Sequence, residues 1–124
     1  MQYIGKLDVK KLGKYKEKII TDDVILTEER RIHIYENHTS DYEIIINKIT
    51  DAVLKPKEII EDLKNKDTLF FIGDLGKNNL NVIIKLNTVN SKEHPQNSIM
   101  TAWVIRDSNL KKLREKNKIV YKKE

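Results

Sequence analysis

The chain has 124 residues, of which 39% are hydrophobic and 35% are charged, and its formal net charge is +5. This length suits one domain with one core, and the absence of cysteine excludes disulfides and cysteine-ligated zinc sites, as is usual in the reducing cytoplasm. No apolar run reaches the roughly 18–20 residues that cross a bilayer, and the first residues are too polar for a secretory signal, so we expect a cytoplasmic protein without a membrane partner.

The charged residues are distributed unevenly along the chain. Residues 1–20 hold six lysines against two acids, residues 21–110 hold eleven basic residues against fifteen acidic ones, and residues 111–124 hold seven against two. Basic ends attract phosphate groups, but a solvated lysine-rich surface is the simpler interpretation of charge alone. We treat residues 1–20 as an N-terminal basic strand or arm and residues 21–124 as the main domain.

The first 40 residues predict a short strand, a connector and a helix. Apolar residues alternate over 3–9, which is typical of an edge strand, and the charged segment 13–18 follows as a connector. Thr27 is a suitable N-cap, and the two glutamates after it suit the positive end of a helix dipole. We therefore expect the first helix over about 28–37.

The next segment predicts a second helix with a clear start and end. Ser40 and Glu43 fit the capping box S-x-x-E, and the helix should end before Pro56, because the residue ahead of a proline resists helical geometry. Residues 56–65 are interpreted as one short helix or a turn. The apolar positions at helical spacing are Tyr42, Ile45, Ile46, Ile49 and Val53.

After residue 66 the hydrophobic period changes to that of strands. We expect strands over 68–73, 80–87, 97–105 and 118–122, a hairpin turn over 74–79, a polar loop over 88–96 and a short helix over 108–116. Helices first and an antiparallel meander afterwards give an α+β fold. We predict a single domain with N-terminal helices packed on an antiparallel β-sheet.

Alternation along two of these strands separates a core face from a second face. Leu80, Val82, Ile84 and Leu86 fall on one face of the strand over 80–87, and Lys85 falls on the other. On the strand over 97–105, we place Thr101 and Trp103 together and Met100, Ala102 and Val104 opposite them. If the aliphatic faces form the core, Lys85, Thr101 and Trp103 line an open concave face. Lys85 would then meet a phosphate and Trp103 would stack on a base; the alternatives are a solvated lysine and a core tryptophan.

The segment "RRIHIYENH" holds two of the three histidines, His33 and His38. Five residues separate them, or roughly 140° around a helix, so they do not share one compact face. This is not the i, i+4 spacing of a zinc pair. Arg31 and His38 share the apolar arc of the helix, whereas His33 lies on the polar stripe. Spacing alone favours two ordinary surface histidines over an acid/base apparatus.

Taken in order, these segments resemble the phage-type barnase–EndoU–colicin–RelE-like (BECR) nucleases over roughly residues 20–122. The resemblance depends on a Thr-Glu helix start followed by two histidines five apart, and on a second helix that bears a tyrosine and ends before a proline. A strand with a lysine comes next, and then Asn-Ser, Thr and Trp on another strand. The segments are "ILTEERRIHIYENH", "DYEIIINKITDAVLKPKEII", "NVIIKLNT", "NSIMTAWVIRDSNLKKL" and "IVYKK".

The resemblance implies that residues 21–124 form a metal-independent endoribonuclease domain without a cofactor, with helices packed on an antiparallel sheet. Carried over residue by residue, the catalytic candidates are His33, His38, Lys85 and Thr101. The candidates for substrate binding are Arg31, Ser98 and Trp103. Histidine titrates near neutral pH, so it suits both the base that activates the 2′-hydroxyl of RNA and the acid that protonates the leaving oxygen.

The same resemblance implies a biological setting. Members occur in phages and mobile elements of bacteria, often as toxin or effector domains, so we expect RNA, with tRNA among the candidates, as the substrate. An antitoxin or immunity protein is a candidate partner. The alternative is a non-catalytic RNA- or protein-binding module that keeps the fold without the chemistry.

Overall fold

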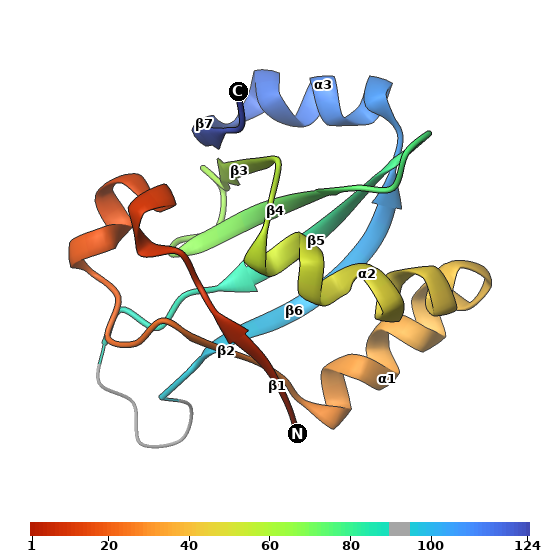
Figure 1. The fold of residues 1–124 in the computed structure, drawn as a ribbon, viewed down its shortest axis with the longest axis horizontal. Coiled ribbons are helices and arrows are strands. Elements are labelled where there is room, and N and C mark those ends of the chain that lie inside the picture. Colours follow the sequence, from red (N-terminus) through yellow and green to blue (C-terminus); the bar gives the residue numbers. More distant parts are fainter. Residues whose placement is uncertain (90–94) are drawn as a thin grey trace.

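The computed structural model describes residues 1–89 and 95–124 (Figure 1). Within these residues, seven strands form one sheet with the order β1-β2-β6-β5-β4-β3-β7. The strands are β1 (Gln2–Lys6), β2 (Asp23–Leu26), β3 (Glu58–Glu61), β4 (Thr68–Asp74), β5 (Asn79–Lys85), β6 (Asn97–Ile105) and β7 (Lys118–Lys122). The helices are α1 (Glu28–Asn37), α2 (Tyr42–Leu54) and α3 (Asp107–Lys116), with short 3-10 helices η1 (Val9–Lys11), η2 (Gly13–Glu17) and η3 (Thr39–Asp41).

The predicted α+β class is confirmed, with a mixed rather than a purely antiparallel sheet. Strands β2 and β6 run parallel, through the pairs Val24–Asn97 and Ile25–Ser98, while the other neighbouring strands are antiparallel. A parallel pair needs a long crossover, and here the chain from α1 to β5 lies between the two strands. This short parallel pair leaves the rest of β6 free for contact with α1.

The two faces of the sheet carry two separate cores. Helix α2 packs on one face through Ile45, Ile49, Ala52 and Val53, and this main core includes the predicted aliphatic face of β5. The 3-10 segment joins the main core through Leu12 and Tyr15. Helix α3 covers part of the other face, where Leu110 packs with apolar side chains of β3, β4, β5 and β6. Figure 1 shows α3 and α2 on opposite sides of the strands.

Two sequence predictions about the first half were wrong. The segment after Pro56 forms strand β3 instead of a helix or turn, because the carboxylates of Glu58 and Glu61 are buried against partners distant in sequence. The capping box does not form: the N-cap of α2 is Asp41, without a side-chain hydrogen bond. Residues 39–41 form η3 instead, so the helix begins one turn after η3 starts.

The face predicted for Met100 was also wrong. The β5–β6 register shifts between Ile83 and Ile84, which pair with Thr101 and Ile99. The extra residue is a β-bulge, and it places Met100 with the α3 core on the same side as Trp103. The predictions for Thr101 and Trp103 survive because both lie beyond the bulge. Part of the predicted polar loop, residues 90–94, lies outside the described residues.

Candidate active site

A cleft of about 620 Å³ opens between the N-terminal end of α1 and the adjoining ends of β5 and β6. Lys85 and Ser98 line it and lie away from the main core, because Ile84 and Leu86 on either side of Lys85, and Ile99 after Ser98, are buried in that core. The cleft is lined by Thr27, Glu29, Arg30, Lys66, Asp67, Lys85, Leu86, Asn87, Thr88, Val89, Gln96, Ser98 and Met100.

Lys85 and Ser98 stand opposite each other across the β5–β6 ladder. The Lys85 ammonium donates a hydrogen bond to the backbone oxygen of Lys66 at 2.5 Å, which fixes it at the wall of the cleft. An ammonium has three donors, and among the described residues this hydrogen bond uses one of them, which leaves two to face a phosphate oxygen. A cation and a hydroxyl are thus held side by side at the predicted positions.

The cleft has more cations than carboxylates. Arg30 and Lys66 join Lys85 there, against Glu29 and Asp67. The Asp67 carboxylate accepts a hydrogen bond from the Thr88 hydroxyl at 2.8 Å. The net positive lining suits an anionic ligand such as a phosphodiester.

His33 lies on the exposed side of α1 and is held by Asn37. The Asn37 amide donates to the backbone oxygen of His33 at 2.8 Å, and its nitrogen lies 3.2 Å from Nδ1 of the His33 ring. His33 is exposed as a residue, and this contact involves Nδ1 of the ring and not Nε2. His33 therefore lies on the same polar stripe as Arg30, one turn further along α1.

His38 is brought to the sheet at the end of α1. It is the C-cap of the helix, and its backbone departs from helical geometry at φ −138° and ψ 46°. The imidazole stacks on Trp103, with ring centroids 6.1 Å apart and an interplanar angle of 29°. The two histidines thus face different surroundings, as their spacing predicted.

Thr101 and Arg31 are less accessible to a substrate than the sequence analysis predicted. The Thr101 hydroxyl is buried and has no hydrogen-bond partner among the described residues. Arg31 donates to the Tyr42 hydroxyl at 2.7 Å and pairs with Glu28, and these hydrogen bonds raise the pKa of its guanidinium. Arg31 therefore ties α1 to α2, while the neighbouring Arg30 lines the cleft.

The structure brings the predicted residues to one face of the sheet in two groups. Lys85 and Ser98 form the group in the cleft, and His38 and Trp103 form the other. Trp103 pairs with Asn81, which is four residues from Lys85, so the groups are roughly 13 Å apart along the strands. Sequence reasoning missed Arg30 and Lys66. The polar stripe shared with His33 was a signal for Arg30, whereas Lys66 lies in a turn that carries no periodic signal.

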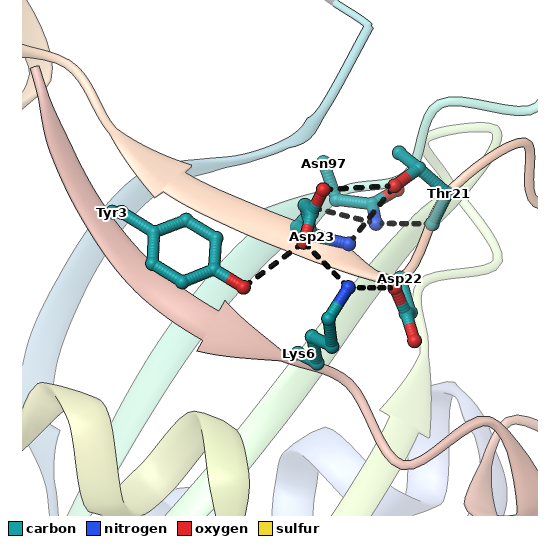
Figure 2. A network of polar contacts seen from close by, with 6 residues as sticks. All are labelled: Tyr3, Lys6, Thr21, Asp22, Asp23 and Asn97. Carbon is teal, nitrogen blue, oxygen red and sulfur yellow. Dashed lines mark hydrogen bonds and ion pairs between the residues drawn. The ribbon is translucent and has the colours of Figure 1, made fainter.

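A polar network around the buried Asn97 side chain joins strands next to the cleft, and its outer members Tyr3, Lys6 and Asp22 are at the surface (Figure 2). The fully buried Asn97 amide donates to the backbone oxygens of Thr21 and Asp23 at 2.8 and 3.0 Å, and its oxygen accepts from the backbone of Asn87 at 2.8 Å. Figure 2 also shows the Asp23 carboxylate held by Tyr3 and Lys6 of β1. Asn97 therefore joins β2 to β6 one residue before Ser98.

The family model described as phage-Barnase-EndoU-ColicinE5/D-RelE like nuclease2 matches residues 3–122. The chain belongs to this nuclease family. No curated protein and no solved structure gives a significant match.

The family match confirms the resemblance seen in the sequence. The matched range includes most of residues 1–20, and the boundary predicted at residue 20 stays a prediction. In the described part of the chain, none of the helices has the length and hydropathy needed to cross a bilayer. Residues 1–89 and 95–124 hold no group of three or more His, Cys, Asp or Glu side chains arranged to hold a metal ion.

Proposed function

We propose that this nuclease-family protein is a metal-independent endoribonuclease that cleaves RNA by attack of a 2′-hydroxyl on the adjacent phosphate. The observation that supports it is the cross-strand pair Lys85–Ser98 in a positively lined cleft, with the His38–Trp103 stack on the same face of the sheet. The first pair offers a cation and a hydroxyl donor for a phosphate. The second offers a titratable ring beside an aromatic platform.

The reaction assigns a distinct role to each group. One of His33 and His38 removes the proton from the 2′-hydroxyl, whose oxygen then bonds to phosphorus as the bond to the 5′-oxygen breaks. A general acid protonates that 5′-oxygen, leaving a 2′,3′-cyclic phosphate on the upstream fragment. Lys85 stabilises the charge that builds on the phosphate oxygens, an effect typically of a few kcal/mol. Because the His38–Trp103 stack lies roughly 13 Å from Lys85 along the strands, His38 and Lys85 act on one phosphate only if the Lys85 side chain moves from Lys66 toward Trp103 when RNA binds. Because the two histidines face different ways, the RNA also has to bend around the end of α1 for both to take part.

The buried Thr101 hydroxyl alters one predicted role. Ser98 lines the open cleft and is only half-buried, so it is the better-placed hydroxyl for a phosphate oxygen. Thr101 lies two residues before Trp103 on the same face of β6. Trp103 is half-buried, which leaves part of its ring available for a base.

The phage-type family supports a wider proposal. In it, the protein is a toxin or effector encoded by a phage or mobile element and acts on RNA, including tRNA, in the bacterial cytoplasm. An antitoxin or immunity protein would hold it inactive in its own host. Toxicity on expression that a co-expressed neighbouring gene relieves is the test of this setting.

The direct test is cleavage of a mixed tRNA and rRNA pool in EDTA, with analysis of the product ends. We expect the wild type to yield cyclic-phosphate ends, and the double variant His33→Ala, His38→Ala and the single variant Lys85→Ala to yield far fewer. Lys77→Ala is a matched control, because Lys77 is an exposed lysine in the β4–β5 hairpin. Circular dichroism and thermal unfolding establish that each variant is folded.

Two results would contradict the proposal. Undiminished cleavage by the folded double-histidine variant would remove these side chains from the mechanism. If the folded wild type cleaves no RNA with or without added metal, the protein is instead a non-catalytic RNA- or protein-binding module.

A further inference from the structure

The two basic segments at the ends of the sequence meet in space. A Cβ atom placed on Gly13 of η2 would lie 3.1 Å from a methyl carbon of Val120 in β7. The Lys11 ammonium lies 4.9 Å from the ring centroid of Tyr121, also in β7. The N-terminal 3-10 segment and the C-terminal strand thus form one continuous part of the surface.

Buried side chains organise the lysines at this junction. The Tyr15 hydroxyl donates to the Glu61 carboxylate at 2.9 Å, and both side chains are more than nine-tenths buried. The Lys14 ammonium lies 2.8 Å from the same carboxylate and 5.3 Å from the Tyr15 ring centroid. The Lys18 ammonium lies 5.9 Å from that centroid. These contacts hold the ammonium groups of Lys14 and Lys18 around the Tyr15 ring.

The charge of this junction is positive after its carboxylates are counted. Strand pairing places Lys118 opposite Glu61, which adds a fourth lysine. We define Lys11, Lys14, Lys18 and Lys118 as the basic surface. The acids at this junction are the buried Glu61, Asp8, whose carboxylate lies 3.8 Å from Lys11, the exposed Glu17 of η2, and Asp67, whose charge acts on Tyr15. Against these four acids stand the five lysines of residues 8–18 and the two of β7, so lysines are in excess.

The basic surface is separate from the cleft but connected to it. The 3-10 segment packs on the main core, whereas the cleft opens on the opposite side of β5 and β6. The backbone of Ile20, just after η2, donates to the backbone oxygen of Asn87 in the cleft wall at 3.0 Å. A polyanion that leaves the cleft past Asn87 therefore reaches the basic surface around this side of the sheet.

We propose that the basic surface binds the phosphate backbone of RNA outside the cleft, and so favours long RNA over short RNA; this inference rests on the proposed ribonuclease function. Four lysines and no arginine suit phosphates met as point charges, without base recognition. The composition does not suit a protein partner, because lysine is depleted and large aromatic anchors are enriched at the centres of protein interfaces. The two tyrosines here are committed to packing beneath the lysines.

The test uses the variant Lys11→Gln, Lys18→Gln, Lys118→Gln, which keeps Lys14 so that the buried Glu61 carboxylate retains its partner. The matched control is Lys48→Gln, Lys77→Gln, Lys112→Gln, which removes the same charge from exposed positions on α2, the β4–β5 hairpin and α3. Both sets are made in the His33→Ala, His38→Ala background, and binding to a labelled single-stranded RNA of about 30 nucleotides is measured between 50 and 200 mM salt. Binding is thereby measured without cleavage.

We expect the first variant to bind the long RNA about tenfold more weakly at low salt, and its salt slope to fall by about 2, since each lost phosphate contact removes about 0.7. The control should change affinity by about twofold or less. In the catalytic background, cleavage of a short oligonucleotide should be unchanged by the first variant while cleavage of long RNA slows.

The proposal is overturned if both sets weaken binding equally, because net charge alone would then account for the effect. It is also overturned if polyglutamate competes as well as RNA of equal charge, which would indicate an acidic protein as the ligand. Failure of the proposed ribonuclease function gives a different result: the wild type cleaves no RNA, but the basic-surface variant still binds RNA more weakly than the control variant.

Discussion

The imidazole of His38 lies against the indole of Trp103, with 6.1 Å between the ring centroids. The contact joins the C-cap of α1 to the C-terminal part of β6, where no strand pairing with β2 remains. It sets the position of a candidate catalytic ring relative to the sheet. Within residues 1–89 and 95–124, the hydrogen bonds of His33, one and a half turns earlier on α1, are with Asn37 of its own helix, and its ring makes no stacking contact with the sheet.

The stack predicts a specific spectroscopic difference between the two histidines. Trp103 is the only tryptophan in the chain, so tryptophan fluorescence reports on this one indole, which contacts His38 and the α3 core. We expect His38→Ala to expose the indole, shift its emission to longer wavelength and lower stability by about 0.5–1.5 kcal/mol, the usual contribution of an aromatic pair. His33→Ala should leave the spectrum unchanged. Equal spectra for the two variants would mean that His38 does not stack on Trp103 in solution.

Asn97 predicts a large effect of a one-atom change. In Asn97→Asp the two donated hydrogen bonds to Thr21 and Asp23 are lost, and a buried carboxylate faces two backbone oxygens. We expect a loss of about 2–3 kcal/mol of unfolding free energy in urea denaturation. Asn78→Asp, in the exposed β4–β5 turn, is the control and should change stability by about 0.5 kcal/mol or less. A loss no greater than that of the control would show that the amide does not hold β2 to β6.

Glu61 predicts a pH-dependent contribution to stability. Burial acts to raise the pKa of its carboxyl, but hydrogen bonds from Lys14 and Tyr15 outweigh burial, and the pKa is lowered from 4.5. The ionised carboxylate therefore stabilises the folded state above about pH 4.5, and this contribution is lost as the pH falls through the lowered value.

The measurement is the difference in unfolding free energy between the wild type and Glu61→Gln at pH 7 and at pH 3. We expect the unfolding free energy of the wild type to exceed that of Glu61→Gln at pH 7, and this difference to become smaller at pH 3. Glu115→Gln, on the exposed side of α3, should show no such narrowing. A difference that stays constant with pH would mean that Glu61 is neutral in the folded protein.

Local sequence patterns predicted most of the elements of this fold. The helix over 28–37 and the strands over 97–105 and 118–122 have the predicted bounds, because capping residues and alternation are local signals. Strand β3 was not predicted, because glutamates such as Glu58 and Glu61 are usually exposed and the segment shows no alternation of apolar and polar residues. They are buried only because Arg114 pairs with Glu58 at 2.7 Å and Lys14 and Tyr15 meet Glu61, and such distant partners leave no mark in a window of ten residues.

For the candidate site, the sequence predicted the faces of the strand residues but not the cleft. Alternation along β5 correctly placed Lys85 away from the main core, and the place of Trp103 on the opposite face survived the bulge that displaced Met100. The cleft itself was not predictable, because Arg30 and Lys66 come from a helix and a turn whose positions depend on tertiary packing. The contact between the basic N-terminal and C-terminal segments could not be predicted either, because it also depends on tertiary packing.

Gly73 predicts how closely α2 packs on the sheet. A Cβ atom placed on Gly73 in β4 would lie 2.6 Å from the Cβ of Ala52 and 3.1 Å from its Cα, so Gly73→Ala forces the helix away. We expect a loss of about 1–3 kcal/mol in thermal or urea unfolding.

Ala52→Gly makes room for the added methyl group but weakens α2 by itself by about 1 kcal/mol. The double variant should therefore be more stable than the sum of the two single losses predicts, by about 0.5 kcal/mol or more. Only part of the loss should be recovered, because the backbone of residue 52 still lies within the contact distance. Strictly additive losses would show that α2 does not rest on β4 at Gly73, and the main core that holds β5 and its Lys85 in place would then need a different packing.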